Sequence, residues 1–305
     1  MRWLSTVASL GLAGWLLVIV VPRIGGGGWS GILAQLSGIG VGVLAGLAVL
    51  WFAGLWAYTY VLTGSLPGLH NGQAFALNAA GSAVSNLLPF GGAAGVAVTV
   101  AMAASWGHKG QAIATSTVVS GVWNTAARLV LPVFAVVALA GSGVSVDGRV
   151  ITVTVVAAGV LVVGLAGLAL PERWLKKAPV VLRLRRNISA VVRTGWGKMT
   201  GGMVAYLALQ AVLMWACLSA TGVWLGFGAT VAAFAVSRLL TLVVITPGGV
   251  GVSENGTIAL LLALGHPAAS VAAGVLLFAF FTFLIEIPVG GLAWLIWSVL
   301  RARSA

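Results

Sequence analysis

Residues 246–256 read TPGGVGVSENG, and this stretch interrupts an otherwise apolar segment that runs from Ala229 to Leu264. A proline removes a backbone donor, and glycines allow dihedral angles that other residues avoid, so a helix breaks where they cluster. We therefore predict two short helices with a turn between them. The predicted breakers are Pro247, Gly248, Gly249 and Gly251.

An earlier apolar segment, Gln73 to Trp106, is interrupted in the same way. Each arm of the two segments has ~11 to 18 residues, which is short for crossing ~30 Å of hydrocarbon but suited to reaching its middle and returning. We therefore predict two re-entrant helical hairpins, 73–106 and 229–264. The breakers in the first are Pro89, Gly91, Gly92 and Gly95.

The composition around these hairpins is that of a membrane protein. Of the 305 residues, 60% are hydrophobic and 7% are charged, against roughly 25% charged in soluble domains. We predict an all-α polytopic membrane protein with six further full spans. The first, Trp3 to Val21, is longer than the apolar core of a signal peptide and no clear cleavage site follows it, so we expect a retained helix. The others are Ile39 to Thr63, Ala112 to Ala140, Val150 to Leu170, Gly201 to Leu225 and Ala268 to Leu300.

The net charge of +12 is interpreted as a record of topology and not as a nucleic-acid surface. Eight basic residues lie between Glu172 and Lys198, so this segment is expected inside as a basic cytoplasmic loop, 172–200, that contacts anionic lipid. With both hairpins re-entrant, twelve of the sixteen Lys and Arg residues fall inside. This charge distribution predicts a plasma (inner) membrane protein with both termini cytoplasmic.

An internal repeat relates the two hairpins. A shift of 158 places Pro89 on Pro247, His108 on His266 and Arg128 on Glu286, and a shift of 159 applies just upstream. We predict two membrane repeats, 1–145 and 146–305. Each has three full crossings, so the second is inverted relative to the first. Inverted repeats with broken helices are typical of transporters, although the breaks could also serve helix packing alone.

Ionisable residues inside the hydrocarbon are costly and therefore mark functional sites. Four fall there: Arg128, Arg238, Glu254 and Glu286. Both arginines are expected to bind a phosphate, assisted by the positive ends of the half-helices after each break. The remaining predicted substrate-binding residues are Asn86, Gly91, Gly92, Gly248, Gly249, Ser253 and Asn255.

Three alternatives for the charged residues stay open at this stage. The two Arg and two Glu could neutralise one another and serve packing alone. Glu254 could cap its own helix, where a first-turn acid is favourable. Arg128 and Glu286, which occupy equivalent repeat positions, could form a bond that opens and closes between two states.

The sequence resembles the transmembrane region of lysylphosphatidylglycerol synthases and the related stand-alone flippase-like membrane proteins. The similarity lies in residues 247–254, PGGVGVSE, in the helix from Thr282 to the PVGG at 288–291, and in NLLP at 86–89. Arg238 and Glu254 match family positions. Relatives often carry Arg and Gly-Glu after the first proline, where this chain has 90–95, FGGAAG, so those contacts are not carried over.

The resemblance implies movement of a lipid between leaflets. In the fused enzymes a soluble domain transfers the amino acid, and we expect no such activity here. We find no P-loop, metal cluster or nucleophile with a base, so we expect neither an enzyme nor a cofactor or bound metal. Membrane lipids, anionic or polyprenyl-phosphate, are the expected partners. The rival functions are a secondary transporter of a small anion and a non-transporting membrane partner of a lipid-modifying enzyme.

Overall fold

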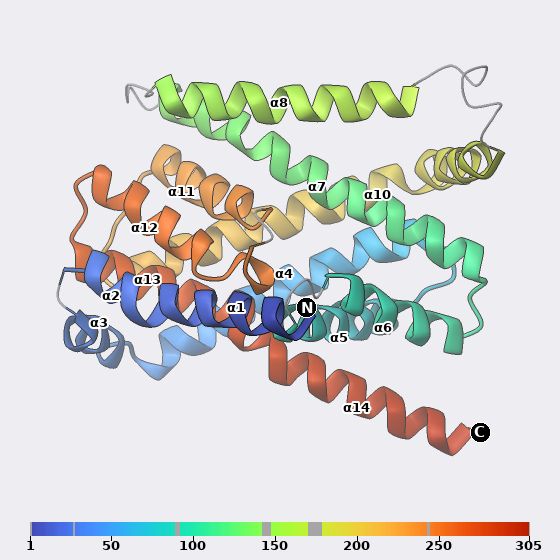
Figure 1. The fold of residues 1–305 in the computed structure, drawn as a ribbon, viewed down its shortest axis with the longest axis horizontal. Helices are drawn as coiled ribbons and strands as arrows, with labels where there is room; N and C mark the ends of the chain where they lie inside the picture. The colour runs from blue at the N-terminus through green and yellow to red at the C-terminus, as the bar shows by residue number, and fades with distance from the viewer. Residues whose placement is uncertain are drawn as a thin grey trace.

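The computed structural model describes residues 2–26, 28–88, 92–141, 148–169, 179–242 and 245–304. All regular structure in these ranges is helical (Figure 1), which confirms the predicted all-α class. The helices in chain order are α1 Arg2–Trp15, η1 Leu16–Val20, α2 Val21–Ile24, α3 Gly28–Ser37, α4 Val41–Ser65, α5 Asn71–Leu87, α6 Gly92–Ser105, α7 Gly110–Gly141, α8 Gly148–Ala169, α10 Pro179–Ala220, α11 Phe227–Leu240, η2 Pro247–Gly249, α12 Val252–Ala263, α13 Ala268–Ala279, η3 Phe280–Leu284 and α14 Glu286–Ser304.

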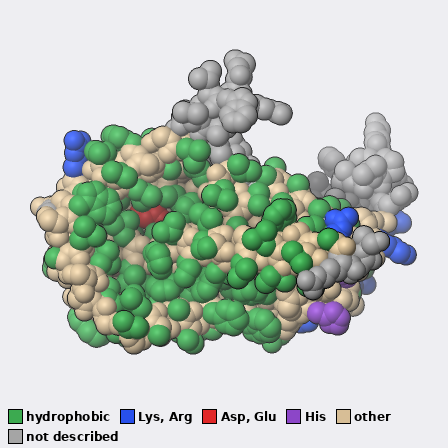
Figure 2. Space-filling model, turned by 90° about the horizontal axis from the view of Figure 1, so that it is seen from below, with side chains coloured by type: hydrophobic (Ala, Val, Ile, Leu, Met, Phe, Trp, Pro, Cys, Tyr) green, Lys and Arg blue, Asp and Glu red, His purple; other side chains and the backbone are tan. Residues whose placement is uncertain are grey.

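The helices identify a multi-pass membrane protein. Within the described ranges, 4 helices are long and apolar enough to cross a membrane, and a pair bent by 87°, Ser9–Ile24 with Gly28–Ser37, would make 5. The 4 are Val41–Ser65, Gly110–Gly141, Arg185–Ala220 and Ala268–Ala302. Figure 2 shows a largely apolar face with Lys and Arg side chains towards the two ends of the long axis, as a bilayer requires. The count of six full spans stays a prediction.

The first hairpin consists of α5 and α6, which pack against each other. Its predicted breakers Pro89 and Gly91 lie outside the described residues. Gly95 was wrongly assigned to the break, because α6 begins at Gly92 and continues through it. A Cβ on Gly95 would lie 2.6 Å from the Gly81 carbonyl oxygen, so this glycine allows the two arms to approach closely.

The second hairpin has its break where the sequence predicts it. Helix α11 ends at Leu240, α12 begins at Val252, and they also pack together. Between them Gly248, Gly249 and Gly251 have φ angles of 60°, 77° and 84°, a region that favours glycine. Figure 1 shows the two hairpins entering from opposite ends of the molecule.

The predicted basic loop, 172–200, is wrong from residue 179 onward. Helix α10 begins at Pro179 and continues to Ala220. A proline fits the first turn of a helix, and Leu and Arg favour helix. Basic side chains therefore lie along a helix that extends beyond its apolar part. Residues 172–178 lie outside the described ranges.

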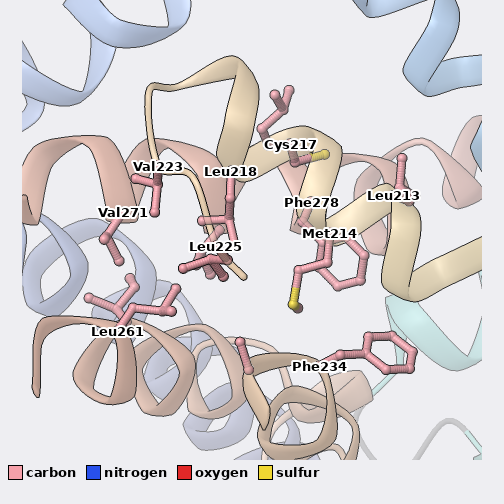
Figure 3. Packing of buried hydrophobic residues seen from close by; sticks show 14 of the residues in the cluster. Leu213, Met214, Cys217, Leu218, Val223, Leu225, Phe234, Leu261, Val271 and Phe278 are labelled. Carbon is pink, nitrogen blue, oxygen red and sulfur yellow. The ribbon is translucent and has the colours of Figure 1, made fainter. Parts of the chain in front are cut away.

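The main core surrounds the second hairpin. Leu213, Cys217 and Leu218 of α10 are fully buried against α11, α12 and α13 (Figure 3). A smaller cluster at the first hairpin includes Leu77 and Met102. The second hairpin is thus held more extensively by apolar packing than the first.

Helices of the first half of the chain pack on helices of the second half. Helix α14 packs on α5, α7 packs on α11, and α4 packs on α10. The turns after α6 and α12 also match, since His108 N donates to Ala103 O at 3.3 Å and His266 N donates to Leu261 O at 3.2 Å. The glycines preceding these histidines have φ of 84° and 85°. Both turns are the glycine-dependent helix termination that satisfies the last carbonyls.

Candidate functional site

A cavity of about 530 Å³ lies where the breaks of the two hairpins meet. Its walls come from α4, both hairpins, α7, α10 and the start of α14. The tips are in contact, because a Cβ on Gly248 would lie 3.2 Å from Asn86 Oδ1. The predicted site residues that line the cavity are Arg128, Arg238, Glu254, Glu286, Asn86, Gly92, Gly248, Gly249 and Ser253.

Two predicted site residues are not among those lining residues. Gly91 lies outside the described part of the chain. Asn255 does not line the cavity, and its Nδ2 donates to Gly251 O at 2.6 Å and to Leu16 O at 3.3 Å. The helical rotation between Ser253 and Asn255 turns Asn255 towards η1, so this residue fastens the hairpin tip to the N-terminal helix.

Arg238 approaches the cavity from α11. Its guanidinium carbon lies 5.5 Å from the ring centre of Phe234 and 5.2 Å from that of Phe278, both core residues (Figure 3). These rings attract the cation through their π faces. Its Nε is buried without a hydrogen-bond partner. Arg238 also forms a side-chain hydrogen bond with Tyr206 of α10. The side chain is therefore held by aromatic contacts and by Tyr206, and its Nε remains a donor without a partner.

Arg128 approaches the same cavity from α7. Its Nη1 donates to Thr241 Oγ1 at 2.9 Å, and that hydroxyl donates to Arg238 O at 2.6 Å. The chain of hydrogen bonds joins α7 to the end of α11, beside the hairpin break. Arg128 and Arg238 also lie within electrostatic range of each other, so two like charges share one cavity.

Glu254 caps its own helix. Its Oε2 accepts a hydrogen bond of 2.5 Å from Gly251 N, and the residue is only 7% exposed. The carboxyl thus satisfies a backbone donor in the first turn of α12, where a negative charge is favourable. In this conformation Glu254 therefore caps α12 while it also lines the cavity.

Glu286 begins α14 and lies beside Ser82 and Asn86 of α5. Asn86 Nδ2 donates to Phe283 O at 3.3 Å, which ties the end of the first hairpin arm to the turn before Glu286. Arg128 and Glu286 thus each lie beside a hydroxyl on a hairpin, Thr241 on the second and Ser82 on the first. In the predicted repeat, the shift of 159 would align Ser82 with Thr241, and the shift of 158 would align Arg128 with Glu286.

Direct neutralisation among the four charged residues is absent from the described structure. Neither Arg128 nor Arg238 forms an ion pair with Glu254 or Glu286 there. Arg238 lies within electrostatic range of both carboxyls. The predicted Arg128–Glu286 bond is not formed, although both residues line the same cavity.

Several cavity residues were not predicted. Tyr58 and Tyr206 line it and their rings meet edge to face at 5.1 Å, and Thr241 orients Arg128. A sequence signal did exist: polar residues recur every three to four positions towards Arg128, which indicates one polar helix face. These are Thr117, Ser120 and Asn124 on α7, with Asn78, Ser82 and Ser85 forming a similar stripe on α5.

Residues 3–290 match the family model described as the lysylphosphatidylglycerol synthase TM region. The chain belongs to this family, as the motifs at residues 86–89 and 247–254 indicate. No curated protein matches the chain. Membership assigns the chain to membrane proteins of lipid metabolism or translocation.

Proposed function

We propose that this member of the lysylphosphatidylglycerol synthase TM region family moves an anionic, phosphate-bearing lipid between the two leaflets. The lipid headgroup would enter the central cavity while its acyl chains remain in the bilayer. Arg128 and Arg238 would bind the phosphate, with the N-terminal turn of α6 at Gly92 nearby. Glu254 would serve as the cap of α12 and not as a ligand.

The observation that carries this proposal is the pair of arginines in one cavity, neither of which forms an ion pair with the cavity carboxyls Glu254 and Glu286 in the described structure. Two cations in a site shielded from water repel each other strongly. An anion between Arg128 and Arg238 relieves that repulsion and uses their unfilled donors. Guanidinium groups suit phosphate because they donate in a planar fork, and two arginines allow four such donors to converge on one phosphate.

Transport through this site would use two inverted halves, 1–145 and 146–305. Four features support such a relation: the matched sequence positions, the matched turns after α6 and α12, the exchange of packing between α14–α5 and α7–α11, and the hydroxyls beside Arg128 and Glu286. The site would lie at the repeat interface, where transporters of this type bind substrate. Rocking one half against the other would expose it alternately to the two sides.

The remaining parts of the proposal concern the membrane, the topology and the energy source. The chain would lie in a bacterial plasma (inner) membrane with six crossings and both termini cytoplasmic. Basic side chains of 172–200 would contact anionic lipid on the inner surface. The protein would act without a cofactor and would not be an enzyme. Glu286, which does not cap a helix N-terminus through a backbone bond as Glu254 does, is the candidate proton carrier if a gradient drives transport.

Reconstitution in liposomes tests the proposal. Fluorescent phosphatidylglycerol, phosphatidylcholine and a polyprenyl phosphate are placed in the outer leaflet, and their loss from it is followed for the wild type, Arg238→Ala and the control Arg23→Ala. Arg23 is exposed on α2 and does not line the cavity. We expect preferential movement of the anionic lipids and a loss of about tenfold or more in Arg238→Ala alone, since a charge-assisted hydrogen bond contributes ~1.5–3 kcal/mol.

Equal lipid movement by the wild type and Arg238→Ala would refute the role of Arg238. Uptake of inorganic phosphate without lipid movement would instead support the small-anion transporter. A protein whose cellular function survives loss of Arg128 and Arg238, but not neutralisation of the basic segment, would be the non-transporting partner.

A further inference from the structure

A second cavity, of about 360 Å³, lies at the base of the first hairpin. It is a groove between the first turns of α5, the end of α6 and the last turns of α14, and we refer to it as the hairpin-base groove. None of its described lining residues also lines the central cavity. The groove is therefore a separate place on the molecule, at the end of the hairpin opposite to its tip.

Trp297 is fixed in the wall of this groove. Its Nε1 donates to Ser105 Oγ at 3.0 Å, and that hydroxyl donates to Met102 O at 2.6 Å. These bonds join α14 to the last turn of α6. An indole held in this way at a helix end is typical of the membrane–water interface, where Trp is enriched.

Arg301 lies one turn further along α14 and its guanidinium carbon is 5.5 Å from the Trp297 ring centre. The aromatic face holds the cation at the mouth of the groove. The side chain is exposed, and no acidic residue occurs among the described lining residues. A positioned, accessible guanidinium without a neighbouring acid is suited to bind an anion.

The walls behind Arg301 are apolar. Ala76 of α5 faces Ala293, Ile296 and Leu300 of α14 across the groove, which suits an acyl chain. The start of α5 lies at the same end and carries the partial positive charge of a helix N-terminus. The groove thus combines an apolar slot with a positive mouth. The mouth is complementary to the negative headgroup of an anionic phospholipid, and the slot is complementary to its acyl chain.

We propose that the hairpin-base groove binds an anionic glycerophospholipid that is not the transported molecule. Arg301 binds its phosphate and one acyl chain lies between α5 and α14. Because the groove joins both arms of the first hairpin to α14, the bound lipid fastens the base of the hairpin. This site does not depend on the central cavity or on transport.

Native mass spectrometry of the full chain in detergent tests this site, with phosphatidylglycerol and phosphatidylcholine added separately. The variants are Arg301→Gln, which removes the charge, and Ala293→Leu, which fills the slot and keeps the charge. These variants are made in an Arg238→Ala background, which removes binding at the central cavity. Arg23→Gln in the same background is the matched control, because Arg23 is exposed on α2. Retention of a folded mass envelope and an unchanged melting profile without lipid verify each protein.

The wild type is expected to bind phosphatidylglycerol at both cavities. The Arg238→Ala parent and the Arg23→Gln control are expected to retain one phosphatidylglycerol, at the hairpin-base groove, in preference to phosphatidylcholine. Arg301→Gln and Ala293→Leu are expected to bind it about tenfold more weakly, as loss of one charge-assisted contact or of the slot predicts. Binding of phosphatidylglycerol to both variants with the affinity of the Arg238→Ala parent would overturn the site. Displacement of the lipid by millimolar inorganic phosphate would also overturn it, because it would show a simple anion site without an acyl chain.

Discussion

Replacement of Glu254 tests whether this carboxyl stabilises the fold or acts in transport. Glu254→Ala removes the acceptor of the 2.5 Å bond from Gly251 N and leaves that donor buried. A charge-assisted hydrogen bond raises the free energy of unfolding by ~1.5–3 kcal/mol, and a favourable charge at a helix N-terminus raises it by a further ~0.3–1 kcal/mol. Both contributions are lost in Glu254→Ala. Part of this is offset because the buried carboxylate is no longer desolvated. We expect a net destabilisation of about 2 kcal/mol.

Glu254→Gln keeps an acceptor oxygen but loses the charge, so its expected cost is about 1 kcal/mol. For a chain of this size ~1 kcal/mol corresponds to roughly 2 °C in melting temperature. Thermal unfolding in detergent should therefore show a decrease of about 4 °C for Glu254→Ala and about 2 °C for Glu254→Gln. Lipid transport, measured well below both melting temperatures, should persist in Glu254→Gln.

Glu286→Gln provides the matched comparison, because Glu286 is also a cavity carboxyl but accepts no backbone cap bond in the described structure. We expect Glu286→Gln to lower the melting temperature by less than Glu254→Ala does, and to reduce gradient-driven transport. Abolished transport in Glu254→Gln at unchanged melting temperature would refute the capping assignment and show that Glu254 acts in transport itself.

Three further predictions concern the site, the packing and the topology. Arg128→Lys keeps the charge but loses the guanidinium fork and its bond to Thr241, so anionic lipid transport in liposomes should decrease about tenfold, and a wild-type rate would contradict it. Gly290→Ala places a methyl against Ala79 O, whereas the methyl of Gly291→Ala meets open space. Calorimetry should therefore show a loss of ~1–3 kcal/mol in the free energy of unfolding for Gly290→Ala alone. Equal melting temperatures for the two variants would contradict the close α5–α14 contact. Because Cys217 is the only cysteine and is buried, single cysteines placed at residues 109 and 301 in a Cys217→Ser background should be labelled from the cytoplasmic side, and labelling from outside would refute the topology.

The main breaks of the fold were predictable because proline and glycine act locally. The turn at residues 247–251 follows from missing donors and positive φ angles, which do not depend on distant contacts. Gly95 was misassigned for the same reason: a glycine that permits helix contact cannot be distinguished locally from one that breaks a helix. The helix beginning at Pro179 was not predicted, because the cluster of basic residues was interpreted as a loop. The residues themselves favour helix.

The charged residues of the site were predictable and their partners were not. An ionisable residue inside an apolar helix is costly wherever it lies, so Arg128 and Arg238 are recognisable in isolation. Thr241 and Arg128 are more than a hundred residues apart, and only the packing of α7 on α11 brings them together. The bond from Asn255 to Leu16 O likewise joins residues more than two hundred positions apart, so sequence periodicity alone does not identify this partner.

Photo-crosslinking from inside the central cavity would detect directly whether a lipid headgroup binds beside Arg238. A photoreactive side chain is introduced at Asn124, which lines the cavity, or at Val212, which is exposed on α10, in liposomes that contain radiolabelled phosphatidylglycerol or polyprenyl phosphate. The account predicts labelled lipid captured at Asn124 with the wild-type arginines and strongly reduced capture after Arg238→Ala, while capture at Val212 stays unchanged. Equal capture at Asn124 with and without Arg238 would contradict it.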